Sequence, residues 1–292
     1  MKHWINVSGA FAASLLLSAC SGLTFVAANA GARAGDFSRR ADLPYGANPR
    51  QRLDAYVPDG ARNRPIIVFW YGGSWQEGGK GQYRFVGSAL ARAGYVAVLP
   101  DYRLYPEVRF PDFMDDAAAA LAWTVNHAAE LGGDPSRVYL AGHSAGAHIA
   151  GLLAYDSARL EKAGLEPGVV KGFIGLSGPY ALDPDTDVLK TIFGPPYGFD
   201  DWQPVRKVTA SSPPALLIHG EADGVVWVSH TKAMAEALTR AGVPVTMRLY
   251  PGRKHADTVA PFAKLAPRKL PVLAEIEKFV GGEMPGGEPT GH

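Results

Sequence analysis

The sequence has little from which a disulfide, a metal site or a charged docking surface could be built. Its single cysteine cannot form an internal disulfide, and no group of cysteines and histidines has metal-site spacing. Lysine plus arginine number 29 against 28 for aspartate plus glutamate, which leaves a net charge of +1. No run of like charges and no repeat of solenoid period occurs. These absences argue against a metal site, a nucleic-acid partner and an acidic surface partner.

What is present is typical of a soluble globular enzyme. Hydrophobic residues make up 47% of the 292 positions and charged residues 20%. That length accommodates one large α/β domain with a sizeable core.

The N-terminus has the pattern of an export signal. A short basic start precedes Trp4 to Leu17, which is mostly apolar but too short for a comfortable membrane span. Leu17-Ser18-Ala19-Cys20 then resembles the bacterial lipobox, in which the cysteine becomes the lipidated first residue. Ser21 after it favours an outer-membrane anchor by the same resemblance. The alternative is cleavage after Ala28-Asn29-Ala30, which would release a periplasmic or secreted protein.

The composition divides the chain into segments. Residues 1–20 are the predicted lipoprotein-type signal and residues 21–42 a flexible Ala/Gly-rich tether. Residues 43–280 form one predicted folded domain, in which residues 181–212 are an irregular, lid-like insertion rich in Asp, Pro and Gly. Residues 281–292 are predicted to be a disordered tail.

Short apolar runs alternate with helical patterns along the predicted domain. The expected strands are residues 51–57 (an edge strand), 66–71, 95–99, 137–141, 169–176, 215–219 and 243–250. The expected helices are residues 83–93, 112–131, 145–155, 228–241 and 270–280. Such alternation predicts an α/β fold with a mostly parallel central sheet and helices on both faces.

Gly142-His143-Ser144-Ala145-Gly146 is the most informative local pattern. A lone G-x-S-x-G is often only a Gly/Ser turn, but here a predicted strand precedes it and a predicted helix follows it. In that context the glycines permit a very sharp turn that leaves the serine hydroxyl projecting near the positive end of the helix. We therefore predict that Ser144 is a nucleophile.

A serine nucleophile needs a base and a group that orients the base. His255 follows the predicted strand 243–250 and a Pro-Gly turn, so it arrives from a loop at the carboxyl edge of the sheet. The other histidines have less suitable places: His3 in the signal, His127 and His230 on helices, His143 and His148 beside the serine, His219 at a strand end and His292 in the tail.

The orienting acid is expected between the serine and the base in the sequence. Asp223 lies on the loop after the predicted strand 215–219 and fits that order. Glu221 and Asp257 compete with it, although Asp257 is too close to His255 along the chain to curl back easily. A carboxylate that merely caps its own loop is the alternative interpretation of Asp223.

Donors for a developing oxyanion are expected beside the serine. The amide of Ala145 follows the nucleophile, and the amides of Gly73 and Ser74 lie in the Gly-Gly loop after the predicted strand 66–71. A plain Gly-Gly turn is the alternative. The predicted substrate contacts are Trp75 and Tyr180, with three further aromatics that are otherwise core: Phe193, Tyr197 and Trp202.

Taken together, these stretches resemble the α/β-hydrolase fold carboxylesterases, in the feruloyl-esterase-like and kynurenine-formamidase-like branch related to hormone-sensitive lipases. The resemblance covers about residues 48–280 and includes Asp101-Tyr102-Arg103-Leu104-Tyr105-Pro106-Glu107. It implies hydrolysis of esters or aryl formamides through an acyl-enzyme, without a cofactor. The family usually has His before the Gly-Gly pair, where this chain has Tyr71. Glu107 resembles a residue that braces the oxyanion region, or is ordinary surface charge.

The sequence therefore predicts an exported serine hydrolase with a Ser144–His255–Asp223 triad acting on small carboxylic esters, such as short acyl or aryl esters. An arylformamidase, amidase or exopeptidase with the same triad is the alternative. A non-catalytic binding protein that keeps the fold is the third possibility, suggested by Tyr71.

Overall fold

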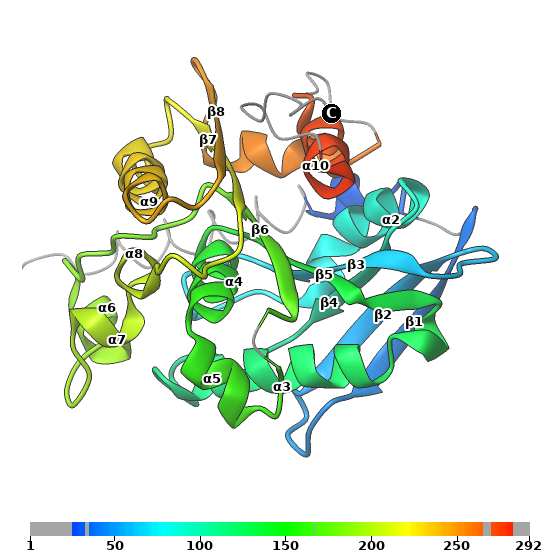
Figure 1. Cartoon of the computed structure of the whole chain (residues 1–292), viewed down its shortest axis with the longest axis horizontal. Coiled ribbons are helices and arrows are strands. Elements are labelled where there is room, and N and C mark those ends of the chain that lie inside the picture. Colours follow the sequence, from blue (N-terminus) through cyan, green and yellow to red (C-terminus); the bar gives the residue numbers. More distant parts are fainter. Residues whose placement is uncertain (1–24, 33–34, 167, 265–269, 283–292) are drawn as a thin grey trace, which may run out of the picture.

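An eight-stranded sheet crosses the computed structural model, which describes residues 25–32, 35–166, 168–264 and 270–282 (Figure 1). The strand order is β1-β2-β4-β3-β5-β6-β7-β8. The strands are β1 Phe37–Pro44, β2 Arg52–Pro58, β3 Arg64–Trp70, β4 Val96–Pro100, β5 Gly133–His143, β6 Val170–Leu176, β7 Ala215–Gly220 and β8 Val245–Tyr250. β2 pairs antiparallel with β1 and β4, and the other neighbours are parallel. The mostly parallel sheet is confirmed.

Helices cover both faces of this sheet, as predicted. They are α2 Arg84–Arg92, α3 Asp112–Asn126, α4 Ala145–Tyr155, α5 Ser157–Lys162, α6 Asp187–Ile192, α7 Phe199–Trp202, α8 Pro204–Lys207, α9 Val228–Arg240 and α10 Val272–Gly281. Short 3-10 turns are η1 Lys80–Tyr83, η2 Ala129–Leu131, η3 His255–Thr258 and η4 Ala260–Phe262. Figure 1 shows α2 and α10 on one side of the sheet and α3, α4 and α5 on the other.

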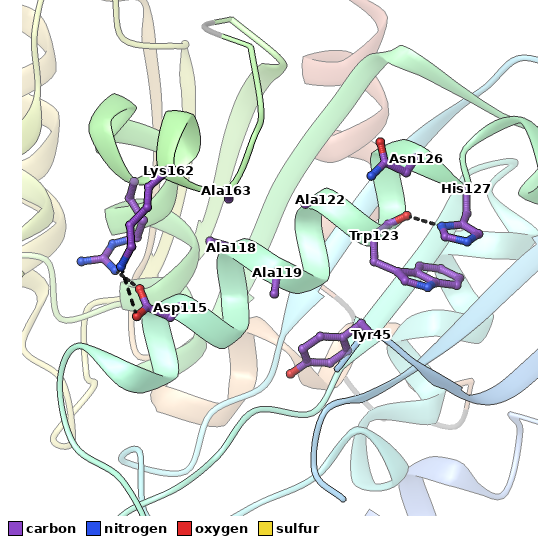
Figure 2. Close-up of a pocket in the computed structure, with 11 residues that line it drawn as sticks. Tyr45, Asp115, Ala118, Ala119, Ala122, Trp123, Asn126, His127, Lys162 and Ala163 are labelled. Atoms are coloured by element: carbon purple, nitrogen blue, oxygen red, sulfur yellow. Dashed lines mark hydrogen bonds and ion pairs between the residues drawn. The ribbon is translucent and has the colours of Figure 1, made fainter. Parts of the chain in front are cut away.

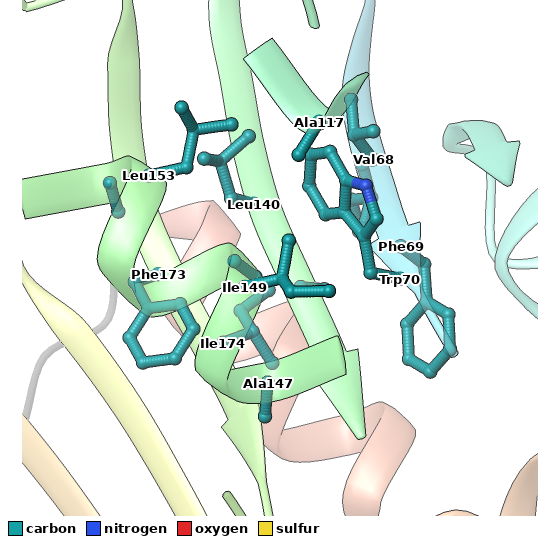
Figure 3. Close-up of a cluster of buried hydrophobic side chains, with 14 of the residues drawn as sticks. Val68, Phe69, Trp70, Ala117, Leu140, Ala147, Ile149, Leu153, Phe173 and Ile174 are labelled. Atoms are coloured by element: carbon teal, nitrogen blue, oxygen red, sulfur yellow. The ribbon is translucent and has the colours of Figure 1, made fainter. Parts of the chain in front are cut away.

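The core lies between α4 and the central strands. Ile149 and Leu153 point from α4 towards Leu140 of β5, and Phe173 of β6 closes the cluster (Figure 3). All four side chains are fully buried. A central parallel strand is covered on both faces, which is why β3 is buried along its whole length after Arg64.

The parallel register brings several strand ends to one edge of the sheet. Trp70 at the end of β3 pairs with Gly142 near the end of β5, and His143 pairs with Leu176 at the end of β6. The loops that follow these strands therefore start side by side, although they lie far apart in the sequence. This edge is where a ligand site is expected in an open α/β sheet.

The predicted tether is wrong for the residues that the structure describes. Residues 37–42 belong to β1, the true edge strand, so the predicted edge strand 51–57 lies inside the sheet as β2. Residues 25–29 form a helical turn on the domain. There the Asn29 side chain donates to the carbonyls of Gly81 and Gln82 at 3.1 and 3.0 Å and accepts from the amide of Phe85 at 3.0 Å.

Other boundaries differ by small amounts. The helix expected over residues 112–131 ends at Asn126, and Gly132 (φ 70°) turns the chain after η2. The insertion at residues 181–212 holds α6, α7 and α8 and lies over the carboxyl edge of the sheet. The predicted signal, including Cys20, and residues 283–292 of the predicted tail lie outside the described residues. In the part that is described, no helix has the length and hydropathy to cross a bilayer.

Candidate active site

Ser144 occupies the sharp turn between β5 and α4. Its backbone has φ 56° and ψ −126°, a strained conformation for a residue other than glycine. A Cβ on Gly142 would lie 2.3 Å from the carbonyl oxygen of Gly146, and one on Gly146 would lie 2.1 Å from that of Trp70. Both glycines are therefore required by close backbone packing. The strain presents the serine side chain to a pocket at the start of α4.

Asp223 and His255 meet on the neighbouring loops. His255 Nδ1 lies 2.8 Å from Asp223 Oδ2, while the amides of Val225 and Val226 each donate to Asp223 Oδ1 at 2.9 Å. Burial alone would raise the pKa of Asp223, but hydrogen bonds from His219, His255 and the Val226 amide hold that pKa well below its usual range. The carboxylate is therefore ionised and fixes the orientation of the imidazole.

His219 holds the loop that carries Asp223. Its Nε2 lies 3.1 Å from Asp223 Oδ2 and 2.9 Å from the carbonyl of Val226, so this nitrogen donates. Its Nδ1 then accepts from the hydroxyl of Thr231 at 2.7 Å. Of the competing acids, Asp257 accepts from the amide of Lys254 and caps its own turn. Glu221 is exposed.

His143 connects the Ser144 turn to His255. Its Nε2 donates to the backbone carbonyl of His255 at 3.2 Å, and the two rings lie 4.7 Å apart. Its Nδ1 therefore accepts, from the Tyr83 hydroxyl at 3.3 Å. Burial, and next the charge of His255, lower the pKa of His143 to about 3, so its ring is neutral. No hydrogen bond between the Ser144 hydroxyl and the His255 ring is formed among the residues described.

The Gly-Gly loop lies against the serine. A Cβ on Gly72 would stand 2.9 Å from the Cβ of Ser144, and one on Gly73 (φ 135°) would stand 2.1 Å from the carbonyl oxygen of Glu77. Ser74 and Trp75 are also left-handed, at φ 52° and 60°. Within the described chain, the amides of Gly73, Ser74 and Ala145 donate to no protein group, so all three are free for a ligand oxygen.

The pocket at Ser144 has a volume of about 610 Å³. Apolar and aromatic side chains make up most of its wall, and its acidic residues are Asp183 and Asp185, with no lysine or arginine in the lining. Val225 and Trp227 are 71% and 70% exposed at its rim. The lining is Ser74, Trp75, Ser144, Ala145, Pro179, Leu182, Asp183, Asp185, Leu189, Gly224, Val225, Val226, Trp227, Ser229 and His230.

Of the predicted substrate contacts, Trp75 lines this pocket and Tyr180 does not. The Tyr180 ring is fully buried against Phe173, at 5.7 Å between ring centroids, because Gly175 leaves room for it next to the sheet. Assigning Tyr180 to the pocket wall is therefore wrong. Phe193 and Trp202 are buried behind Trp75 as core.

Two further predictions concern groups near the site. Glu107 accepts from the side chain of Asn48 at 2.8 Å on an exposed loop and does not contact the Gly-Gly loop directly. The described residues include no group of three or more His, Cys, Asp or Glu side chains placed to hold a metal. Arg50, which contacts the Gly-Gly loop, was not predicted from the sequence, because only the fold brings residues 46–51 next to this loop.

A second cavity of about 450 Å³ lies away from Ser144, between α3, α5 and the loop that carries Tyr45 (Figure 2). Alanines of α3 form its floor, and Trp123 stacks on His127 at one end. The cations at its other end are already paired, since Arg159 and Lys162 lie 2.7 and 3.6 Å from the carboxylate of Asp115. It holds none of the predicted site residues.

Similar proteins are esterases. A family model described as BD-FAE matches residues 53–179, and that of the dienelactone hydrolase family matches residues 181–261. A probable isoprenylcysteine alpha-carbonyl methylesterase of Arabidopsis thaliana is 32% identical over 243 residues, which are 75% of this chain and 57% of that protein. Esterase LipC of Mycobacterium tuberculosis is 32% identical over 227 residues, or 69% and 55%. The chain thus spans little more than half the length of these relatives.

Solved structures share the fold over most of the chain. Esterase B of Lactobacillus rhamnosis has a TM-score of 0.76 at 22% identity, covering 93% of this chain and 94% of that one. Esterase 2 of Thermogutta terrifontis has a TM-score of 0.69 at 25% identity, covering 87% and 95%. With the sheet order and the strand–serine–helix turn, these findings show that the chain belongs to the α/β-hydrolase carboxylesterases.

Proposed function

We propose that the chain hydrolyses small carboxylic esters through an acyl-enzyme formed on Ser144. The observation that carries this proposal is the 2.8 Å contact between Asp223 and His255, on loops that meet the Ser144 turn through His143. A buried carboxylate that fixes an imidazole, on a loop bound to the strained serine turn, is what a nucleophile, a base and an orienting acid require.

In the proposed reaction Ser144 Oγ attacks the ester carbonyl while His255 Nε2 takes the hydroxyl proton. The carbonyl oxygen becomes an oxyanion, which accepts hydrogen bonds from the amides of Gly73, Ser74 and Ala145. His255 returns the proton to the departing alcohol, and a water molecule activated by the same imidazole then releases the acid. Asp223 stays ionised and stabilises the imidazolium.

The pocket favours small, uncharged or cationic esters. Its walls are mainly apolar, and its two carboxylates would repel an anionic substrate. The solved relatives support short acyl groups: esterase B was crystallised with a C4-C4 tributyrin phosphonate, and esterase 2 with butyrate and propionate. Acyl esters of roughly the size of butyrate therefore make the first test substrates.

The test is a panel of nitrophenyl acyl esters and aryl formamides, measured with wild type, Ser144→Ala and a matched control, Ser136→Ala. Ser136 is exposed near the start of β5, at the end of that strand away from Ser144, where its hydroxyl donates to Asp134. We expect Ser144→Ala to lower kcat by about 10³-fold or more and Ser136→Ala to leave it unchanged. Wild type that neither turns over esters nor reacts with a fluorophosphonate at Ser144 would contradict the proposal. Faster cleavage of formamides than of esters would favour an arylformamidase.

We also propose that the protein is exported and carries its lipid on Cys20, on the strength of the Leu17-Ser18-Ala19-Cys20 pattern. Labelling of growing cells with an alkyne-tagged palmitate should mark wild type but not Cys20→Ser. A soluble product beginning at Gly31 would instead indicate cleavage after Ala30.

A further inference from the structure

The Gly-Gly loop is tied at both ends to one guanidinium. Arg50 Nη2 donates to the hydroxyl of Tyr71 at 2.8 Å and to the carbonyl of Gly78 at 3.0 Å. Tyr71 immediately precedes Gly72 and Gly78 follows Glu77, so this nitrogen joins the two residues that flank the loop of residues 72–77. The loop itself supplies the amides of Gly73 and Ser74.

Arg50 is itself held in place by other groups. Its Nε donates to the carbonyl of Tyr102 at 2.8 Å, and its backbone amide donates to the side chain of Asn48 at 2.8 Å. Asn48 is in turn bound to Glu107 at 2.8 Å. The resemblance of Glu107 to a bracing residue thus has a structural counterpart, which acts through Asn48 and Arg50 and not by direct contact.

Packing holds the Tyr71 ring in place beside Arg50. Its ring is buried and stacks on that of Tyr102, at 4.8 Å between centroids and 21° between planes. A Cβ on Gly78 would lie 2.9 Å from the Tyr71 ring and 2.8 Å from the carbonyl oxygen of Gly72, so the two ends of the loop are in direct contact. Burial raises the pKa of the Tyr71 phenol, which therefore stays protonated.

We infer that Arg50 is a positioning residue for the oxyanion donors and acts on their loop through Tyr71 and Gly78. The inference rests on the proposed esterase function. Gly73, Ser74 and Trp75 all have positive φ, so the conformation of the loop costs free energy. The Arg50 guanidinium stabilises that conformation from the side of the loop away from the substrate. A planar guanidinium can bind three oxygens at fixed angles, whereas a lysine cannot.

The test compares Arg50→Met with a matched control, Arg52→Met, and with Tyr71→Phe. Arg52 Nη1 likewise donates to three oxygens, the carbonyls of Gly46, Asn48 and Gln51, but all of them belong to its own loop. For a butyrate ester we expect Arg50→Met to lower kcat by about 10- to 100-fold with KM changed less than about threefold. Tyr71→Phe keeps the ring stack and should lower kcat about 5- to 10-fold, and Arg52→Met less than about twofold.

A second measurement separates positioning from general damage. A trifluoromethyl ketone becomes an oxyanion when Ser144 adds to it, so its inhibition constant should rise in the Arg50 variant by the same factor as kcat falls. The inhibition constant of the product alcohol, which makes no oxyanion, should stay within about twofold. Combining Arg50→Met with Tyr71→Phe should cost little more than Arg50→Met alone, because the Arg50–Tyr71 contact that Tyr71→Phe removes is already lost in Arg50→Met.

The inference is overturned by an Arg50→Met enzyme with wild-type kcat, by an equal loss in Arg52→Met, or by unchanged ketone inhibition. If Arg50→Met does not fold, the inhibition constant of the ketone is measured with Tyr71→Phe, and an unchanged constant overturns the inference. These outcomes differ from a failure of the proposed function, which would show as wild-type turnover that Ser144→Ala does not abolish.

Discussion

The two halves of the candidate site are built by different means. On the acid–base half, Asp223, His219 and His255 are held by side-chain hydrogen bonds of 2.7 to 3.1 Å. On the nucleophile half, Ser144, Ser74 and Trp75 have left-handed backbones, and glycines permit contacts that no Cβ would fit. The first half is specified by polar side chains and the second by backbone conformation and the absence of side chains.

This difference predicts which substitutions each half tolerates. An isosteric change of a polar group should disable the acid–base half without moving its backbone. On the nucleophile half, the same disabling effect should come from the addition of a single methyl group. His143 touches both halves, since its ring lies between the Tyr83 hydroxyl and the His255 carbonyl.

The largest expected effect is that of Asp223→Asn. The amide group would face His255 Nδ1 and force the imidazole into the tautomer that cannot accept the serine proton, so we expect kcat to fall by about 10³- to 10⁴-fold. Asp257→Asn is the matched control, because Asp257 caps only its own turn, and it should stay within about threefold of wild type. If kcat fell equally in the two variants, Asp223 would not be the residue that orients the His255 imidazole.

Gly73→Ala should have the next largest effect. A methyl group 2.1 Å from the carbonyl oxygen of Glu77, at φ 135°, must shift the amides of Gly73 and Ser74, for an expected loss of about 10²-fold in kcat. Gly81→Ala, whose Cβ would meet only the tip of Arg84 at 3.9 Å, is the control. An active Gly73→Ala enzyme would mean that the loop is not specified by close packing.

The connection between the halves should make stability depend on pH. The pKa of His143 is about 3 in the folded protein against about 6.5 when unfolded, so its contribution is complete above pH 6.5 and is lost as the pH falls towards 3. At pH 5 the loss is on the order of 2 kcal/mol. His143→Gln should therefore lose less free energy of unfolding than wild type between pH 7 and pH 5, measured by urea denaturation. If wild type and His143→Gln lost the same free energy of unfolding between pH 7 and pH 5, the His143 ring would not be neutral and buried.

The smallest expected effect concerns the N-terminal turn. Asn29 and Phe25 contact the end of η1 and the start of α2, with the Phe25 ring 5.3 Å from that of Tyr83. A protein starting at residue 31 should be less stable than one starting at residue 21 by about 2 kcal/mol in urea, with similar kcat at 25 °C. Equal stability of the two proteins would indicate that these contacts contribute nothing. Cleavage after Ala30 would then cost the folded domain no stability.

Local patterns predicted most of the fold and the polar half of the site. The strand, glycine turn and helix around Ser144 are adjacent in the sequence, and the parallel order then places Asp223 and His255 on loops at the same edge. β1 was missed because an edge strand exposed on most of its length has no alternating apolar pattern. Arg50 was missed because its three acceptors lie on two distant segments that only the fold brings together.

The docked residues 25–32 also bear on how such an enzyme would sit on a membrane. If the lipid is on Cys20, only residues 21–24 separate it from the helical turn, so the linker spans at most about 18 Å. A catalytic body held so closely could not tumble freely, and the side carrying α2 would face the bilayer. Substrates would then have to reach the pocket from the sides of the domain that do not face the bilayer. A long tether would not restrict their approach in this way.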